Sequence, residues 1–406
     1  MRILQINTVY NRGSTGKIAK ALHDKCIENG HQCISAYRYR EGAWDDTLTV
    51  SSWLDCHIHN RLARYTMLQG FFSRFMTRRF LEKVERYSPD VIHLHNLHGS
   101  YINLKSLFSY IKKHNVAVVW TLHDCWAFTG HCAYFTLAGC DKWREGCHQC
   151  PQLRQIPKSY LDTTKSMYKK KKKMFSSVEN MTIVTPSQWL ADLVKESFLK
   201  NYPVQVIHNG IDLGIFKPTP SDFRQKYNFS ESKKIILGVA FGWGQRKGLD
   251  VFIDLSKRLD EDKYQIVLVG TDDNVDMQLP SNITSIHRTH DQAELAEIYT
   301  AADLFVNPTR EENYPTVNME AIACGTPVLT FRTGGSPEIL DETCGSVVEC
   351  DDIDAMEREI IRICDEKPYS VEACINRSKQ FDMNDRFEEY VKLYEKIGNQ
   401  DCSISL

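Results

Sequence analysis

A chain of 406 residues is too long for one ordinary hydrophobic core, so two domains are expected. Hydrophobic residues make up 42% of the chain and charged residues 25%, which is typical of a soluble globular protein. The formal net charge of −2 argues against a general nucleic-acid-binding protein. No apolar run approaches the roughly 20 residues that a membrane-spanning helix needs, which argues against an integral membrane protein.

The N-terminal stretch MRILQINTV predicts a first buried strand and not a secretion signal, because its apolar run is short and contains Gln5 and Asn7. Without a secretion signal, a cytoplasmic location is expected. In that compartment the fourteen cysteines are expected as reduced thiols or metal ligands and not as disulfides.

Short apolar runs alternate with helical patterns along the chain, which is typical of βαβ units and parallel sheets. In the first half, strands are predicted at 3–6, 32–36, 91–94, 117–122, 181–184 and 204–207. In the second half, they are predicted at 234–239, 265–269, 283–286, 304–306, 327–331 and 346–348. The pattern therefore predicts an α/β fold of two doubly wound halves, in which ligands bind at the carboxyl ends of the strands and in the cleft between the halves.

The segment HNGIDLGIFKPTPSDF, from His208, is rich in Gly, Pro and Asp and predicts an interdomain linker. The predicted domains are an N-terminal domain at 1–207 with a cysteine-rich loop at 125–151, a linker at 208–220, a C-terminal domain at 221–380 and a C-terminal helix at 381–406. The amphipathic pattern of this last helix predicts that it crosses back to pack on the first domain.

The stretch EENYPTVNMEAIACGTP, from Glu311, predicts a loop that leads directly into a helix opened by Pro315 and Thr316. Glu312 then lies in the loop and Glu320 on the helix, about two turns away, so both carboxylates can face one ligand at the helix N-terminus. Such a terminus is a favourable place for a phosphate. A surface helix with two ordinary glutamates is the alternative.

Two further loops have the composition of anion sites. After the first strand, the loop residues Gly13, Ser14, Thr15 and Gly16 allow close approach of a ligand to the backbone, before a helix expected from about Lys17. A plain strand-to-helix turn is the alternative. In the second half, Arg246 and Lys247 lie in a glycine-flanked loop before a helix, where two cations can meet a diphosphate. The alternative there is a solvated basic pair.

The segment TREENYPTVNMEAIACGTPVLTFRTGGSPEIL, from Thr309, resembles the donor-binding signature of the retaining family 4 glycosyltransferases, with two glutamates separated by seven residues. The resemblance extends to HNGID, to the RKG after Gln245 and to IYTAADLFVNPT before the signature. It implies the GT-B fold, in which two Rossmann-like domains face each other across a donor cleft, and transfer of a sugar from a nucleotide donor with retention of configuration.

The same resemblance implies roles for individual residues. Arg246 and Lys247 hold the donor diphosphate, Glu312 lies beside the sugar ring, and Glu320 accepts hydrogen bonds from the ribose hydroxyls. His123 lies near the primary hydroxyl of the sugar or near the acceptor, a helix- or loop-capping pair with Asp124 being the alternative. The remaining donor-binding positions are the backbone of Asn313, Tyr314, Pro315 and Thr316, the base pocket around Arg288, and the loop of Gly13, Ser14, Thr15 and Gly16.

Two positions depart from the family pattern. Asn313-Tyr314 stands where Gly-Phe is usual, which leaves the donor sugar open, and Gly242 stands where an arginine is common, so Arg246 is expected to supply that charge. Retention by double displacement needs a carboxylate nucleophile, for which Glu312 is the candidate in the signature. We expect instead front-face attack, without an obligatory divalent metal.

The stretch TGHCAYFTLAGCDKWREGCHQCP contains four cysteines, Cys132, Cys140, Cys147 and Cys150, the last two as a CxxC pair. Four thiolates match a tetrahedral structural zinc site, and reduced cysteines packed in a loop are the alternative. Because this loop begins beside His123, it is expected to shape the acceptor side.

Basic and aromatic residues interleave from Arg61 to Arg86, with aromatic and leucine positions at helical spacing, and Lys169–Lys173 form a further basic run. Such a face can rest on anionic lipid, the alternative being core aromatics and solvated cations. The expected partners are therefore a UDP- or GDP-linked sugar, a lipid-linked glycan acceptor and an anionic membrane surface. The expected activity is hexosyl transfer in surface polysaccharide assembly. The alternatives are a sugar-nucleotide epimerase, a phosphorylase and a noncatalytic sugar-nucleotide-binding subunit.

Overall fold

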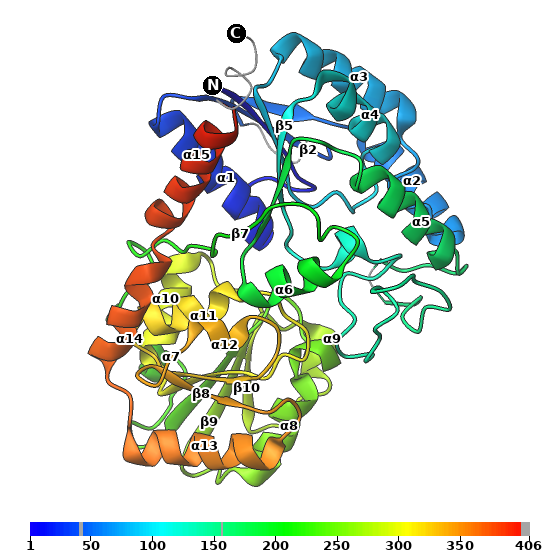
Figure 1. The fold of residues 1–406 in the computed structure, drawn as a ribbon. Coiled ribbons are helices and arrows are strands. Elements are labelled where there is room, and N and C mark those ends of the chain that lie inside the picture. The colour runs from blue at the N-terminus through cyan, green and yellow to red at the C-terminus, as the bar shows by residue number, and fades with distance from the viewer. Residues whose placement is uncertain (40–43, 156, 399–406) are drawn as a thin grey trace. The chain divides into compact units, whose positions relative to one another are not determined.

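The computed structural model describes residues 1–39, 44–155 and 157–398, which form two compact units. One unit contains Met1–His208 and the C-terminal segment that begins at Arg386, and the other contains Asn209–Asp385. Each unit has one parallel sheet with helices packed on it (Figure 1). This arrangement confirms the predicted α/β class with two Rossmann-like domains.

The sheet of the first unit has seven strands in the order β3-β2-β1-β4-β5-β6-β7. They are β1 (Arg2–Ile6), β2 (Gln32–Tyr37), β3 (Thr47–Thr49), β4 (Val91–Leu94), β5 (Ala117–Thr121), β6 (Met181–Thr185) and β7 (Val204–Val206). The central register pairs Leu4 with Ile92 and Ile92 with Val118. Every residue of β4 and β5 is buried, as expected for parallel strands covered on both faces. The strand order reverses beside β1 and β4, so the loops after these strands meet at one edge.

The helices of the first unit are α1 (Gly13–Glu28), α2 (Trp53–Thr66), α3 (Arg74–Tyr87), α4 (Leu104–His114), η1 (Trp126–Phe128), α5 (Thr164–Phe175), α6 (Gln188–Glu196) and α15 (Met383–Gly398). Side-chain caps begin α2, α4 and α6. Ser52, Asn103 and Ser187 each accept a hydrogen bond from a backbone N–H in the first turn of α2, α4 and α6.

The basic and aromatic positions from Arg61 to Arg86, which stand at helical spacing in the sequence, are divided between α2, a connecting segment and α3. Met67 adopts a left-handed conformation (φ 60°) that ends α2, and α3 starts only at Arg74. Consequently the aromatic residues do not share one face: Tyr65 and Phe75 are exposed, whereas Phe72 is partly buried. Within the described residues, no helix has the length and apolar character that crossing a membrane requires.

The sheet of the second unit has six strands in the order β10-β9-β8-β11-β12-β13. They are β8 (Lys234–Val239), β9 (Tyr264–Val269), β10 (Ile283–Ile286), β11 (Leu304–Asn307), β12 (Val328–Phe331) and β13 (Gly345–Val348). The helices are α7 (Phe223–Lys226), η2 (Gln245–Lys247), α8 (Leu249–Arg258), α9 (Asp273–Asp276), α10 (Gln292–Ala301), α11 (Thr316–Ala323), α12 (Ser336–Ile339), α13 (Ile353–Glu366), α14 (Val371–Ser378) and η3 (Lys379–Phe381). Here the strand order reverses between β8 and β11, which places the loops after these two strands side by side.

The predicted linker at 208–220 is folded against the second unit. The Ile211 N–H donates to the Phe381 carbonyl at 2.8 Å, the Met383 N–H donates to the Ile211 carbonyl at 3.0 Å, and Phe216 is buried. A side chain at Gly210 would collide with the backbone of Met383. The linker segment around Ile211 is therefore hydrogen-bonded to the residues at the start of α15.

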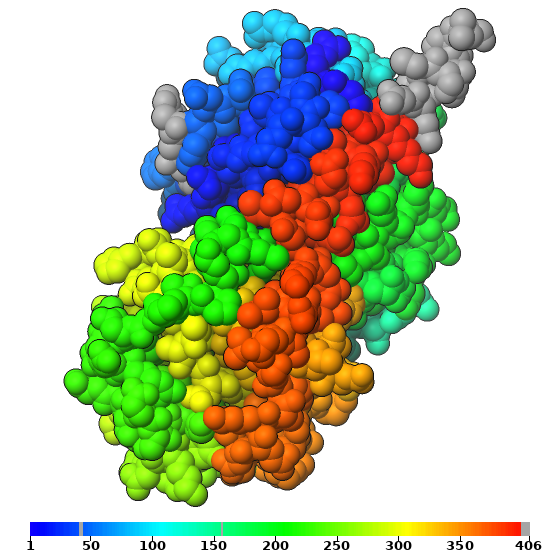
Figure 2. All heavy atoms as spheres, turned by 90° about the vertical axis from the view of Figure 1, so that its left-hand side faces the viewer, coloured from blue at the N-terminus to red at the C-terminus, as the bar shows by residue number. Residues whose placement is uncertain are grey.

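From Arg386 onward, α15 packs on the first unit. The Tyr394 hydroxyl lies 2.6 Å from His93 Nδ1, and Thr121 Oγ1 donates to the Tyr390 hydroxyl at 3.2 Å. Asn29, at the end of α1, donates to Glu388 at 3.2 Å. Figure 2 shows this C-terminal helix in red against the blue N-terminal residues. The last part of the predicted C-terminal segment, 399–406, lies outside the described residues.

Candidate functional site

Two cations and a carboxylate meet at the carboxyl edge of the second sheet, between β8 and β11. Lys247, at the end of η2, donates from Nζ to Glu312 Oε2 at 2.5 Å. Arg246 donates to the Glu311 carbonyl at 3.1 Å, and its own carbonyl accepts from the Arg310 N–H at 2.9 Å. The strand order places the loop after β8 next to the loop after β11. The hydrogen bonds of Arg246 and Lys247 connect these two loops.

Glu312 is held as a carboxylate by its neighbours. Its side chain is enclosed, which by itself would raise its pKa, but the charge and hydrogen bond of Lys247, the charge of Arg246 and the Asn313 N–H outweigh burial and lower the pKa. Oε1 accepts from the Asn313 N–H at 3.1 Å, while Oε2 accepts from Lys247. Both carboxylate oxygens are therefore engaged.

Arg310 fixes the relative position of the two loops, and the sequence analysis did not identify it. Its guanidinium donates two hydrogen bonds of 2.8 Å to Asp250 on α8 and one of 2.6 Å to Asp351 after β13. A fourth hydrogen bond goes to the Gln245 carbonyl in η2. The available signal was a charged residue directly after a buried strand, but its partners are distant in the sequence.

Glycines allow close backbone contact around Glu312. Gly334 has φ of +55°, and a Cβ there would collide with the Glu312 carbonyl. The next residue, Gly335, donates from its N–H to the Asn313 carbonyl at 2.7 Å. Only glycine adopts this conformation without strain while leaving room for the loop.

Glu320 lies on α11, more than a turn beyond its start at Thr316, and is 9% exposed. The Tyr299 hydroxyl, from α10, donates to Glu320 Oε2 at 3.2 Å. Burial and the neighbouring Glu320 carboxylate raise the pKa of Tyr299, so this phenol stays protonated as a donor. Tyr299 is a second residue that the sequence analysis missed.

The remaining predicted donor positions of the second unit differ in what they can present to a ligand. Pro315 caps α11 and Thr316 begins it. The Tyr314 ring is buried against Phe381, and the Tyr314 carbonyl accepts from Asn209 at 3.2 Å, so its side chain belongs to the core. Arg288 is exposed after β10, and β9 and β8 separate that strand from β11.

The predicted glycine loop lies in the first unit, at the carboxyl end of β1. The helix α1 starts at Gly13, earlier than the Lys17 expected from the sequence. Gly13 has φ of +62°, and Asn7 donates to the Thr15 carbonyl at 3.1 Å. Gly13 and Ser14 are exposed and Gly16 is buried against the loop before it.

His123 lies at the carboxyl end of β5 and is hydrogen-bonded to a second histidine. Its Nε2 is 3.1 Å from His95 Nδ1, and His95 Nε2 is 3.2 Å from Gln5 Oε1. Burial lowers the pKa of His123 to about 4 against the opposing effect of Asp124, and burial also lowers the pKa of His95. Both rings are therefore neutral at physiological pH.

This chain of hydrogen bonds fixes the tautomer of His123. The Gln5 amide nitrogen donates to the Ala19 carbonyl at 3.2 Å, so the amide oxygen accepts from His95 Nε2–H. His95 Nδ1 is then an acceptor, and His123 donates to it from Nε2. Nδ1 of His123 is consequently a hydrogen-bond acceptor.

Asp124 has the geometry of a capping residue, which was the alternative predicted for it from the sequence. Asp124 Oδ1 accepts from the Trp126 N–H at 2.8 Å, at the start of η1, and Oδ2 lies 2.8 Å from His98 Nε2. Burial opposes ionisation of Asp124, but the His98 charge and hydrogen bond lower its pKa. The motif HLHNLH, which contains His93, His95 and His98, was the signal for this histidine group in the sequence.

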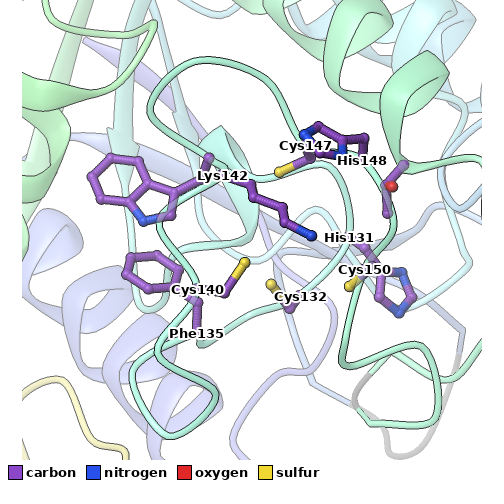
Figure 3. A pocket seen from close by; sticks show the side chains of 10 residues that line it. His131, Cys132, Phe135, Cys140, Lys142, Cys147, His148 and Cys150 are labelled. Carbon is purple, nitrogen blue, oxygen red and sulfur yellow. The ribbon is translucent and has the colours of Figure 1, made fainter.

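The four cysteines of the predicted zinc site line one small cavity in the loop between η1 and α5, together with His131, Lys142 and His148 (Figure 3). A hydrogen bond with Cys132 lowers the pKa of Cys150 to about 7. The sulfur atoms are not at coordination spacing. In the described part of the chain, the group of three potential ligands close enough to share an ion is the exposed set Asp273, Asp276 and His287.

Two family models match the chain. "Glycosyltransferase Family 4" matches residues 16–214, and "Glycosyl transferases group 1" matches residues 233–366. A curated relative from Escherichia coli (strain K12), "Putative colanic acid biosynthesis glycosyl transferase WcaC", is 25% identical over 98% of this chain and 100% of its own length. The "N-acetyl-alpha-D-glucosaminyl L-malate synthase" of Bacillus anthracis is 28% identical over 40% of this chain and 45% of its own length.

Solved structures share the fold over 97–98% of the chain. Sucrose-phosphate synthase from Thermosynechococcus elongatus has a TM-score of 0.72 at 18% identity, covering 98% of both chains. HepE from Anabaena in complex with UDP-glucose has a TM-score of 0.68 at 14% identity, covering 97% of this chain and 99% of that one. At these identities the likeness establishes the fold, which is GT-B.

Proposed function

Because this chain belongs to the family 4 glycosyltransferases, we propose that it transfers a hexose or an N-acetylhexosamine from a nucleotide sugar, UDP-linked in preference to GDP-linked, with retention of configuration. The proposed acceptor is a lipid-linked oligosaccharide in surface polysaccharide biosynthesis. The observation that carries the proposal is the pair Lys247–Glu312 beside Arg246 and the start of α11. The names of the colanic acid relative and of the UDP-glucose complex support the pathway and the nucleotide.

In this proposal the diphosphate binds where positive charge is concentrated. Lys247 uses one of its three N–H donors on Glu312, which leaves two for phosphate oxygens. Arg246 adds a second positive charge, and the start of α11 adds backbone N–H donors and the positive end of the helix dipole. These groups stabilise the charge that develops on the departing diphosphate, so no divalent metal is required for that step.

The engagement of Glu312 supports front-face attack over a covalent intermediate. A nucleophilic carboxylate needs one oxygen directed at the anomeric carbon. In Glu312 one oxygen accepts from Lys247 and the other from a backbone N–H. We therefore assign Glu312 to electrostatic positioning beside the sugar, and the departing phosphate oxygen accepts the proton of the attacking hydroxyl.

His123 has the hydrogen-bond polarity that the proposed role needs. Its neutral ring presents Nδ1 as an acceptor, which suits a sugar or acceptor hydroxyl as donor. Glu320, oriented by Tyr299, is assigned to the ribose hydroxyls, since a buried carboxylate forms strong hydrogen bonds to such donors.

The proposed function is tested by ligand-dependent unfolding and by product analysis. A matching nucleotide sugar at 100 times its dissociation constant should add about 2.7 kcal/mol of stability, measured by thermal shift against a panel of UDP- and GDP-sugars. With a lipid-linked acceptor, the product should retain the anomeric configuration of the donor, and transfer should persist in excess chelator. An epimerised nucleotide sugar or a sugar phosphate formed without acceptor would instead support the other reaction types, and binding without turnover would support a noncatalytic subunit.

We also propose that α2 rests on an anionic membrane surface. Its exposed face carries Trp53, Leu54, Ile58, Leu62 and Tyr65, which are between 41% and 61% exposed. Exposed Arg61 and Arg64 flank this face, and exposed apolar residues among cations are typical of interfacial helices.

Vesicle sedimentation checks this proposal. The chain should bind phosphatidylglycerol vesicles and not phosphatidylcholine vesicles, and the double change Leu54→Ser with Ile58→Ser should weaken binding about tenfold or more, because two exposed aliphatic side chains no longer insert. Met277→Ser removes an exposed apolar residue (78%) of the second unit and should leave binding unchanged. If the Leu54→Ser, Ile58→Ser variant bound the anionic vesicles as well as the Met277→Ser variant does, α2 would not be the membrane-binding helix.

A further inference from the structure

The loop from Thr129 to Thr163 connects η1 to α5, and among its described residues there is no helix or strand. Loops of this length without secondary structure are uncommon in compact domains and need another source of order. Part of this loop is nonetheless buried: Cys132, Phe135 and Trp143 belong to the core of the first unit. This irregular backbone therefore needs a stabilising interaction other than the hydrogen bonds of helices and strands.

Four thiols of this loop converge. Cys132, Cys140, Cys147 and Cys150 line one cavity of about 20 Å³, and Figure 3 shows their sulfur atoms directed toward a common space. A site of this size holds one water-sized particle or one ion. None of the cysteines in the described part of the chain forms a disulfide, so all four sulfurs are available as ligands.

The surroundings of the thiols suit a negatively charged metal–thiolate centre. The Gly130 N–H donates to Cys147 Sγ at 3.1 Å, and such a hydrogen bond stabilises negative charge on a metal-bound thiolate. A Cβ at Gly130 would crowd Cys147 and the Thr164 carbonyl, so this approach needs glycine. Lys142 reaches the same cavity from a partly exposed position, and His131 lies there with a buried Nε2 that has no partner.

We propose that Cys132, Cys140, Cys147 and Cys150 bind one structural zinc ion that folds the 129–163 loop. The distance between sulfurs in a tetrathiolate site is about 3.8 Å, given a Zn–S distance of about 2.3 Å. The thiols need to close by side-chain rotation to reach it. The Lys142 amine, which donates to the Gln149 carbonyl at 2.9 Å, remains beside the centre as a compensating charge. A zinc tetrathiolate carries two net negative charges, which Lys142 and His131 can stabilise.

The ion would also support the first-unit site through η1. Lys171 is fully buried on α5 and donates to the Trp126 carbonyl at 2.6 Å and the Thr129 carbonyl at 3.1 Å. Its Nζ lies 3.4 Å from the centre of the Trp126 ring. Since the Trp126 N–H is bonded to Asp124, the loop and the His98–Asp124 pair form one connected structure.

Metal analysis of the full-length chain, purified without a metal-affinity tag, tests the zinc assignment independently of glycosyl transfer. One zinc per chain is expected, and Cys147→Ser or Cys140→Ser should reduce it at least tenfold. Cys350→Ser changes an exposed thiol of the second unit and should retain one zinc per chain. Cys125→Ala changes a further thiol, which precedes η1 and does not line the cavity, and should also retain one zinc per chain.

Cobalt substitution on the unmodified chain keeps the test decisive if the serine variants fail to fold. A chain exchanged into Co²⁺ should show thiolate-to-metal charge-transfer absorption with the intensity of a tetrahedral tetrathiolate. In a separate measurement, the metal-bound chain should have four fewer thiols that react with a thiol reagent than the same chain has after the metal is removed by a chelator. Three results would overturn the proposal. The folded chain could hold no zinc and give no such absorption, it could purify with iron, or the Cys140→Ser variant could keep its full metal content.

Discussion

Replacing Lys247 with alanine should lower the turnover number of glycosyl transfer by about 10²–10³-fold, the usual cost of removing one preorganised group that stabilises developing charge. The change removes the cation nearest Glu312 and two donors assigned to the diphosphate. It also leaves the enclosed Glu312 without its principal partner, so burial should raise the pKa of that carboxyl. The acidic limb of the pH–rate profile should consequently move to higher pH.

A double-mutant cycle separates the two functions of Lys247. If Lys247 only neutralised Glu312, the additional change Glu312→Gln would restore activity to the Lys247→Ala variant. We expect no such rescue, because the lost phosphate contacts are not replaced. Lys257→Ala, at an exposed position in the last turn of α8, away from η2, is the control and should retain full turnover. Rescue by Glu312→Gln would contradict the phosphate-binding role.

The strands could be predicted because parallel strands buried on both faces are nearly continuous apolar runs, as in Val91–Leu94 and Ala117–Thr121. β3 was missed since its three residues, Thr47–Thr49, lie at the sheet edge and are only partly buried. The break between α2 and α3 was missed because a left-handed residue at Met67 has no sequence signature as clear as glycine.

The candidate site was predictable where its residues follow neighbouring strands, and less so where partners come from distant segments. Lys247 and Glu312 could be placed at one edge from strand order alone. Arg310 and Tyr299 could not, because their functions depend on contacts with Asp250 and Glu320 that only the folded chain brings about. The buried ring of Tyr314 similarly shows that a residue of the signature can belong to the hydrophobic core.

Replacing Glu320 with glutamine should raise the KM for the nucleotide sugar about 10–100-fold, since hydrogen bonds to a charged partner contribute about 1.5–3 kcal/mol. The proposed contacts are to the ribose, which does not react, so they should be equally strong in the ground and transition states. The turnover number should therefore change little. Steady-state kinetics with varied donor measures both constants.

Tyr299→Phe provides the matched test of positioning. It removes the hydroxyl that donates to Glu320 and keeps the buried ring, which packs against Phe305 and Phe216. Without this donor the carboxylate loses its fixed orientation, so the donor KM should rise in the same direction as in Glu320→Gln but by a smaller factor. The two changes combined should be less than multiplicative, because the hydroxyl acts through the carboxylate. A fall in the turnover number of Glu320→Gln at constant KM would contradict the ribose assignment and place Glu320 closer to the reacting atoms.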